Sequence, residues 1–340
     1  MSVGVAIVGS GIFAREQHLP AVVASKDLSL KAIYSRSLKS AQGLAEGTDA
    51  GLYSEDSGAG KGYDDLLARQ DVVAVVIALP ILVQPEFIRK ALSAGKHVIS
   101  EKPIAKDIAT AQELLQWYHS NVDTKKVLWA VAENFRFYNS FTFAAEQVKK
   151  LGRIQNFRVN LHVSVKPDSK YYQTEWRKTP GYQGGFVLDG GIHSVAGLRL
   201  ILGQDPVATL SAHSTLITPR LPPIDTVDAI MKTQNGAPGI FSVSFGSQFN
   251  DNGFEFACEK GVVAVSRGAV TVNGEKTETD DRSNGVAAEI DAWAASIVKG
   301  EPLDPRQTAE EGLADLEILE QMLQSGEKDG EKVKLQLQVK

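Results

Sequence analysis

The sequence predicts an α/β protein with two domains: a doubly wound parallel sheet at the N-terminus, followed by a second α/β domain that is rich in strands. Three observations lead to this prediction. The chain has 340 residues, which is enough for two separate cores. Apolar runs alternate with helical patterns up to about residue 134, as expected of βαβ units. Beyond residue 150, strand-like runs follow one another instead.

The first domain is predicted from five short apolar runs and the helical patterns around them. The predicted strands are Val3–Val8, Leu28–Arg36, Asp71–Pro80, Lys96–Pro103 and Val127–Asn134, and the predicted helices are Glu16–Ala24, Pro85–Ala94 and Ile108–Tyr118. Because crossovers between parallel strands are right-handed, the carboxyl ends of these strands meet at one edge of the sheet, where ligands bind.

The segment GSGIFA, Gly9 to Ala14, lies between the first strand and the first helix and follows the pattern G-x-G-x-x-A. Its glycines permit a tight turn and a close approach of the backbone to a pyrophosphate at a helix N-terminus. The alternative is a simple turn, but the strand before, the helix after and the N-terminal location favour a dinucleotide-binding Rossmann domain. The residues predicted to contact the cofactor here are Gly9, Ser10, Gly11, Ile12 and Phe13.

The end of the second predicted strand indicates which dinucleotide binds. NAD-preferring sites usually carry Asp or Glu there to bind the ribose hydroxyls. Here the strand ends in Ser35 and Arg36, and Asp27 lies before the strand, at its other end. Arg36 suits a 2′-phosphate, Ser35 can donate a hydrogen bond to it, and Lys39 can add charge. The alternative is a solvated surface arginine, but the missing acid and the present base together predict NADP.

The second domain is predicted from six strand-like runs broken by Gly, Asn and Pro. These runs are Ile154–Val165, Val207–Ile217, Asp228–Gly236, Gly239–Phe249, Phe254–Ser266 and Ala269–Gly274. A terminal helix is expected over Gly312–Gln324, where apolar residues recur at helical spacing.

The composition argues against several classes of function. The net charge is −5 and we find no cluster of Lys and Arg, so nucleic acid is not the expected partner. No apolar run approaches the roughly 20 residues of a membrane helix, and the N-terminus lacks the basic segment of a signal peptide. Cys258 is the only cysteine. We therefore expect a cytoplasmic protein without a nucleic-acid or membrane partner. We expect no metal site, because the sequence has neither H-E-x-x-H nor C-x-x-C.

The stretch GGFVLDGGIHS, Gly184 to Ser194, places Asp189 and His193 four residues apart among glycines. If this stretch is helical, both side chains lie on one face, one above the other. Asp-Gly-Gly is also typical of a loop, or of a helix start with Asp189 as the N-cap. A lone histidine is more often structural than catalytic, so the stretch alone leaves these alternatives open.

The motifs as a set resemble those of the Gfo/Idh/MocA oxidoreductases, and the resemblance covers nearly the whole chain. Glu101–Pro103, which follows AGKHVI, resembles the E-K-P signature of that family. GSGIFA resembles its nucleotide loop, and TEWRKTP followed by GGFVLDGGIH resembles its W-R…G-G-x-x-x-D-x-G-x-H signature. GVAAEIDAWAASIVKGEPL is similar to its late helix, and GIFAREQHLP looks closest to fungal NADP(H)-linked members.

The resemblance implies the organisation of the protein. It implies a second domain with a large, open, mostly antiparallel sheet, whose open face commonly forms a homodimer. It assigns 1–134 to NADP binding and 135–340 to substrate binding and dimerisation. The function implied is an NADP(H)-dependent oxidoreductase that transfers a hydride between nicotinamide and a sugar, polyol or small carbonyl substrate. The alternative is a cofactor-sensing regulator on the same fold, which would not need Lys102, Asp189 and His193 together.

The resemblance also implies a site in an interdomain cleft. There Lys102, Asp189 and His193 meet over the nicotinamide as the catalytic residues. His193 can cycle protons at neutral pH. Lys102 can polarise the oxygen or exchange the proton itself, and the sequence does not choose between the two as final donor. The further residues expected to contact the cofactor are Ala78, Leu79, Pro80, Gln84, Glu101, Lys102, Asn134, Trp176 and Arg177. Gln84 stands where the family often carries a histidine.

Overall fold

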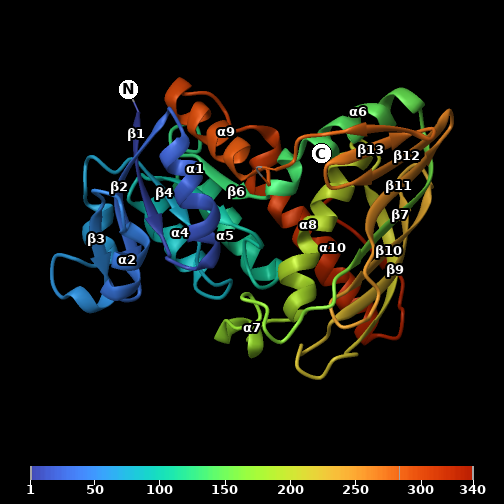
Figure 1. Cartoon of the computed structure of the whole chain (residues 1–340), viewed down its shortest axis with the longest axis horizontal. Helices are drawn as coiled ribbons and strands as arrows, with labels where there is room; N and C mark the ends of the chain where they lie inside the picture. The colour runs from blue at the N-terminus through green and yellow to red at the C-terminus, as the bar shows by residue number, and fades with distance from the viewer. Residues whose placement is uncertain (1, 283, 339–340) are drawn as a thin grey trace. The chain divides into compact units, whose positions relative to one another are not determined.

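The computed structural model describes residues 2–282 and 284–338, which form two compact units (Figure 1). Unit 1 comprises Met1–Glu133 and Val286–Gly312, and unit 2 comprises Asn134–Gly285 and Leu313–Lys340. The chain first passes from unit 1 to unit 2 between Glu133 and Asn134, one residue before the expected domain boundary at 134/135. The segment Val286–Gly312, which the sequence analysis assigned to the second domain, belongs instead to unit 1, because its apolar side chains complete the core of that unit.

Unit 1 contains a six-stranded sheet in which every neighbouring pair is parallel. Its strands are β1 (Val3–Val8), β2 (Leu28–Ser35), β3 (Gly51–Ser54), β4 (Ala74–Ile77), β5 (His97–Glu101) and β6 (Trp129–Ala132). Their order, β3-β2-β1-β4-β5-β6, reverses direction between β1 and β4. The predicted doubly wound sheet is therefore confirmed, and ligand sites in such sheets lie at this reversal.

Helices cover this sheet. They are α1 (Leu19–Ala24), α2 (Leu38–Ala45), α3 (Tyr63–Leu67), α4 (Gln84–Ser93), α5 (Ile108–Asn121) and α9 (Val286–Lys299), with 3₁₀ turns η2 (Glu55–Ser57) and η4 (Pro305–Gln307). The first helix starts earlier than predicted, because the chain is already helical at Ile12 and passes through a π-helical turn, η1 (Ala14–His18), before α1. The sequence analysis did not identify β3, α2 or α3.

The core of unit 1 joins the sheet to the late helix α9. Val5, Ile7 and Ile33 of the central strands are fully buried together with Ile290 and Trp293 of α9. In Figure 1, α9 lies beside α1, against which it packs. Truncating a buried Trp costs about 3–5 kcal/mol, so α9 is an integral part of the Rossmann unit.

Unit 2 contains a nine-stranded sheet in the order β14-β13-β12-β11-β7-β10-β9-β8-β15. Its strands are β7 (Ile154–His162), β8 (Val207–Thr215), β9 (Thr226–Thr233), β10 (Pro238–Ser244), β11 (Asn252–Cys258), β12 (Gly261–Ser266), β13 (Ala269–Val272), β14 (Glu275–Glu278) and β15 (Val333–Lys334). Within the described residues only β7 and β10 pair in parallel, so the expected mostly antiparallel sheet is confirmed.

One face of this sheet is covered and the other is open. The covering helices are α6 (Asn139–Leu151), α8 (Gly185–Leu202) and α10 (Ala309–Glu327), the last of which contains the predicted terminal helix (Figure 1). Strand β9 shows the alternation: Val227, Ala229 and Met231 are buried, whereas Ile230 is 68% exposed. Helix α8 is long and apolar enough to cross a membrane, but 83% of it is buried inside the protein, as expected of a core helix.

Candidate active site

The predicted nucleotide loop forms a turn that only glycine permits at its first position. Gly9 has φ +107°, and a Cβ there would lie 2.2 Å from the carbonyl oxygen of Ala78. A Cβ on Gly11 would meet nothing within 4 Å. The absence of a side chain at Gly9 thus lets the end of β1 lie close to the end of β4. Gly11 faces open space at the point where the helix begins. This is the arrangement in which a helix N-terminus can receive a pyrophosphate.

The end of β2 carries the residues predicted to select NADP. Ser35 is buried and its Oγ accepts a 2.6 Å hydrogen bond from Ser10 Oγ, so the end of β2 is tied to the glycine loop. Arg36 is exposed, and no described residue forms an ion pair with it. The sequence analysis missed Asp56. Its Oδ1 accepts hydrogen bonds from Leu38 N at 2.7 Å and Ser54 Oγ at 2.6 Å, which lower the pKa of the carboxyl and fix a negative charge at the start of α2.

Two buried side chains, those of Gln84 and His18, form hydrogen bonds with the E-K-P segment at the end of β5. Gln84 is 1% exposed, and its Nε2 donates to the carbonyl oxygens of Glu101 at 2.6 Å and Pro103 at 3.0 Å. In this structure Gln84 therefore holds the segment that carries Lys102. His18, fully buried in η1, pairs its Nε2 with Glu101 Oε1 at 2.7 Å.

The remaining residues predicted to touch the cofactor lie in two places. Ala78, Leu79 and Pro80 follow β4 and are partly exposed at the sheet edge that also carries Gly9. Asn134 begins the 3₁₀ turn η3 (Asn134–Phe137) of unit 2. Its Nδ2 donates to the carbonyl oxygen of Asn284 at 2.6 Å, so its amide links two segments of that unit.

In unit 2, the stretch around Asp189 is helical, so the loop and N-cap alternatives for Asp189 are wrong. Helix α8 begins at Gly185 with Gly184 as its N-cap, and Asp189 and His193 follow one turn apart. The glycines serve packing, because a Cβ on Gly190 would lie 2.6 Å from the ring of Phe245. At Gly190 a side chain of the protein therefore takes the space that the missing Cβ leaves.

Asp189 is held by the predicted W-R pair. Arg177, in the short helix α7 (Glu175–Lys178), donates from Nε to Asp189 Oδ2 at 2.6 Å. Its guanidinium carbon lies 3.9 Å from the ring centre of Trp176 and 5.2 Å from that of Tyr171. Burial, with Asp189 adding to it, raises the pKa of the nearby Tyr182. The guanidinium favours the charged carboxylate, so Asp189 is suited to accepting a hydrogen bond.

His193 is oriented by an aromatic ring that the sequence analysis did not single out. The Phe135 ring of η3 stacks on the imidazole with the ring centres 4.7 Å apart and the planes 18° from parallel. His193 itself is half-buried. Stacking of this kind restricts the rotation of the imidazole, so Phe135 is a positioning residue. Phe135 follows Asn134, which was predicted to contact the cofactor, but no local pattern points to its ring partner, which lies 58 positions further on (193 − 135).

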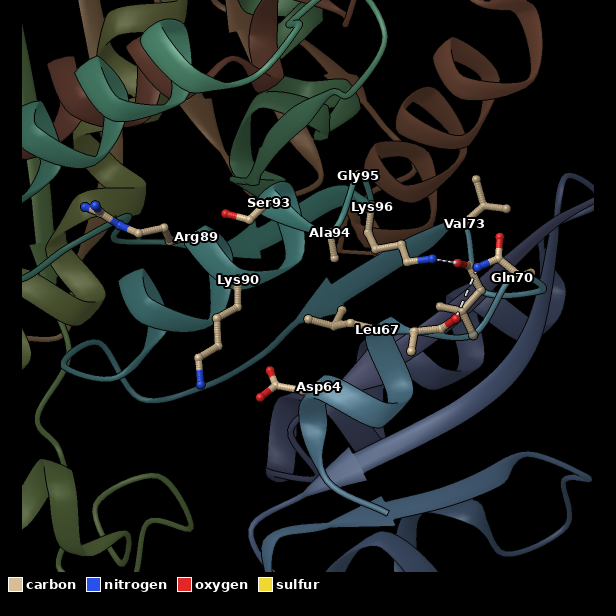
Figure 2. Close-up of a pocket in the computed structure, with 12 residues that line it drawn as sticks. Asp64, Leu67, Gln70, Val73, Arg89, Lys90, Ser93, Ala94, Gly95 and Lys96 are labelled. Atoms are coloured by element: carbon tan, nitrogen blue, oxygen red, sulfur yellow. Dashed lines mark hydrogen bonds between the residues drawn. The ribbon is translucent and has the colours of Figure 1, made fainter. Parts of the chain in front are cut away.

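A cavity of about 850 Å³ lies elsewhere in unit 1, at the amino-terminal edge of the sheet (Figure 2). It is lined by Asp64, Arg89, Lys90 and Lys96 among others, and by none of the residues predicted for the site. Lys96 Nζ donates to two carbonyl oxygens, those of Arg69 and Val72, both at 2.8 Å. Lys96 thus ties the loop before β4 to β5, and we assign the cavity no catalytic role, because ligands of such sheets bind at the opposite edge.

Comparison with known proteins shows the family to which the chain belongs. The profile of the oxidoreductase family Gfo/Idh/MocA, NAD-binding Rossmann fold, matches residues 3–127, and that of its C-terminal alpha/beta domain matches residues 145–335. The chain therefore belongs to the Gfo/Idh/MocA oxidoreductase family.

Among its relatives, the dehydrogenase FPY6 of Fusarium mangiferae is 42% identical, over 96% of this chain and 97% of that protein. The D-xylose 1-dehydrogenase (NADP(+)) 2 of Haloferax volcanii is 27% identical, over 94% and 96% of the two chains. Among solved structures, an oxidoreductase from Thermotoga maritima superposes with a TM-score of 0.89 at 30% identity, covering 98% of both chains. The chain is thus an oxidoreductase on a nucleotide-binding fold.

Proposed function

We propose that the protein is an NADP(H)-dependent oxidoreductase that transfers a hydride between nicotinamide and a sugar, polyol or small carbonyl substrate. The observation that carries the proposal is that Lys102, Asp189 and His193 are all present at the family's motif positions, at the end of β5 and in the first turns of α8. The substrate class is supported by the similarity to a D-xylose dehydrogenase. The direction of the reaction depends on the cellular ratio of NADPH to NADP.

The residues of unit 1 fit a dinucleotide. The turn at Gly9 and the open space at Gly11 leave room for a pyrophosphate at the start of the first helix. Exposed Arg36 and the adjacent Ser35 offer a cation and a hydroxyl for a 2′-phosphate. We therefore infer NADP rather than NAD, and Glu101, Ala78 and their neighbours at the same sheet edge complete the binding surface.

The catalytic residues divide the chemistry between them. When bound, NADP(H) supplies or accepts the hydride. Lys102 as a cation stabilises the charge that develops on the substrate oxygen. His193, oriented by Phe135, gives or takes the proton. Asp189, held by Arg177, accepts a hydrogen bond from a second hydroxyl and so orients the substrate.

A cofactor titration followed by a substrate screen tests this function. NADPH and NADH are titrated by fluorescence, and aldoses, polyols, aldehydes and ketones are then screened for NADPH oxidation or NADP reduction by absorbance. We expect tighter binding of NADPH than of NADH, and turnover with at least one carbonyl or polyol. Tight binding without turnover across the panel would instead favour the cofactor-sensing regulator. Absence of binding would contradict both.

We also propose that the protein is a homodimer through the open face of its nine-stranded sheet. Ile230 of β9 and Ile240 of β10 are paired across the strands and are 68% and 50% exposed, so they form an apolar centre on that face. Arg158 and Glu255, on the adjoining strands β7 and β11, form an ion pair at 3.1 Å. Light scattering should give twice the chain mass, and Ile230→Lys should give the monomer, whereas the exposed Val298→Lys of unit 1 should leave the mass unchanged.

A further inference from the structure

A buried ion cluster in unit 2 has no part in the function proposed above. Asp315 of α10 accepts two hydrogen bonds from Arg136 Nη2, at 2.6 Å on Oδ1 and at 2.7 Å on Oδ2. Its Oδ1 also accepts a hydrogen bond from Arg199 Nη1 at 2.7 Å. The side chains of Arg136 and Asp315 are 2% exposed, and that of Arg199 is 7% exposed. Charges buried this deeply require partners, and one carboxylate here serves two guanidinium groups.

Asp315 thereby joins two segments that are far apart in the chain. Arg136 lies in η3, at the start of unit 2, and Arg199 lies near the end of α8. Helix α8 packs against η3, and the carboxylate binds both from a third element, 179 and 116 positions further along the chain. Charge-assisted hydrogen bonds of this kind are short and directional. The distance between η3 and α8 therefore depends on Asp315.

The same two segments carry the stacked rings of the candidate site. Phe135 directly precedes Arg136 in η3, and His193 precedes Arg199 in α8 by six residues (199 − 193). The ring centres of Phe135 and His193 are 4.7 Å apart. Aromatic pairs stay favourable over a range of separations and offsets, so stacking alone does not fix the backbone that carries Phe135. The ion cluster supplies that restraint one residue away from the ring.

The segment that follows β15 holds Arg199 from another side. Gln338 Oε1 accepts a hydrogen bond from Arg199 Nε at 2.8 Å, and Gln338 Nε2 donates to Glu317 Oε2 at 2.9 Å. Glu317 in turn accepts a hydrogen bond from the backbone N–H of Gln336 at 2.5 Å. Arg199 thus keeps this second partner when Asp315 is removed, which favours movement of η3 rather than of α8, a long and buried helix.

We propose that Asp315 is a positioning residue for proton transfer by His193. It joins Arg136 to Arg199, and this link keeps Phe135 stacked on the imidazole. Both guanidinium groups donate to the same oxygen, Oδ1, so without the carboxylate they face each other in the core and repel. The repulsion moves η3 away from α8, and the imidazole loses the ring that restricts its rotation. This proposal rests on the proposed oxidoreductase function.

Nuclear magnetic resonance of the His193 ring tests the proposal without any substrate. The ring current of the stacked Phe135 shifts the carbon-bound protons of the imidazole upfield, and Phe135→Leu gives their position without it. His193→Ala identifies the signal among the six histidines of the chain. We expect Asp315→Asn to move the signal toward its position in Phe135→Leu. The control Asp205→Asn changes a buried aspartate of unit 2 that binds Asn235 N rather than η3, and should leave the signal in place.

A second variant keeps the test decisive. Arg136→Met is a milder change than Asp315→Asn, because Asp315 and Arg199 remain an ion pair. It removes the link to η3 and should move the His193 signal in the same direction. If Asp315→Asn does not fold, Arg136→Met decides. A His193 signal that stays at its wild-type position in either folded variant would overturn the proposal, whether or not a substrate has been found.

A double-mutant cycle tests the same link in turnover, once the screen has given a substrate. We expect Arg136→Met to lower the single-turnover rate by about 10-fold, a part of the ~100-fold that general acid–base catalysis supplies. NADPH affinity should not change, since the predicted nucleotide loop lies in unit 1. Because Arg136 acts through Phe135, adding Arg136→Met to Phe135→Leu should lower the rate no further. An equal further loss in the double variant would overturn the proposal, whereas absence of turnover in the wild type would contradict only the proposed function.

Discussion

The two units hold their predicted site residues by different means. In unit 1 the contacts fix the backbone: Gly9 lets β1 meet the end of β4, and the side chain of Gln84 donates to the carbonyl oxygens on either side of Lys102. In unit 2 side chains hold one another: Arg177 lies against Trp176 and pairs with Asp189, and Phe135 stacks on His193. We therefore expect the predicted site residues of unit 1 to be sensitive to changes in backbone shape, and those of unit 2 to the loss of a single charge or ring.

The largest effect is expected from breaking the ion pair of unit 2. Arg177→Gln leaves the Asp189 carboxylate, whose side chain is only 10% exposed, without its cation. Removing one partner of a buried pair costs about 3–5 kcal/mol, and thermal or urea unfolding of the protein should show it. The neighbouring Lys178→Gln breaks a pair with Glu175 that is largely exposed, and should cost at most about 1 kcal/mol. Equal losses for the two variants would contradict the comparison.

Gly9→Ala tests the backbone-held half. The new Cβ would lie 2.2 Å from the Ala78 carbonyl oxygen at a φ that L residues rarely adopt, so we expect a loss of about 2–4 kcal/mol in unfolding free energy. Gly11→Ala is the matched control, because a Cβ there meets no protein atom. It should leave stability unchanged and weaken NADPH binding. Equal unfolding free energies for the two variants would show that the close approach of the backbone at Gly9 does not contribute to stability.

His193→Ala should remove proton transfer and leave cofactor binding nearly intact. We expect turnover to fall by about 100-fold or more, the usual scale of general acid–base catalysis. Lys102→Ala should show a loss of similar size. Single-turnover NADPH oxidation with a substrate from the screen measures the loss, and a direct titration measures affinity. Phe135→Leu should give an intermediate loss, because the imidazole keeps its chemistry but not its ring partner. Full turnover in His193→Ala would make the residue structural.

The smallest effect should be confined to one cofactor. Arg36→Ala should weaken NADPH binding by about 1.5–3 kcal/mol, the range for a hydrogen bond to a charged group, and should barely change NADH binding. Asp56→Asn keeps the acceptor for Leu38 N but removes a negative charge near the start of α2, so it should strengthen NADPH binding. Titrations of each variant with NADPH and with NADH measure the two affinities. An equal loss for NADPH and NADH would show that Arg36 does not read the phosphate.

Much of the fold was predictable because its signals are local. The runs that became β1, β2, β4, β5 and β6 are continuous and apolar, and GSGIFA has the glycine spacing of its turn. The short β3 and the amphipathic α2 were missed, because four strand residues and one helical face give little periodicity. The sequence analysis identified α9 as a helix but not the unit to which it belongs. That assignment depends on the packing of Trp293 against β1, β2 and β4, which lie far earlier in the chain.

The sequence points to candidate site residues only where a short motif contains them. Lys102 and Asp189 were proposed from their motifs, whereas His18, Gln84 and Phe135 contact partners 83, 17 and 58 positions away. Such pairings leave no spacing to detect in one sequence. Gln84 shows the consequence: its position predicts a cofactor contact, and the sequence gives no sign that its buried amide also binds the backbone of the E-K-P segment.

The late position of α9 constrains how the chain can be made. The ribosome releases the N-terminal segment first, and nascent domains generally fold as they emerge. The first 133 residues, however, lack Val286, Ile290 and Trp293, which fill the core of their own unit. The core of unit 1 therefore cannot be completed until the nine-stranded sheet of unit 2 and then α9 have been synthesised. A gene fragment that stops at residue 134 would encode a sheet with an uncovered apolar face, a substrate for chaperones and proteases rather than a free-standing cofactor-binding module.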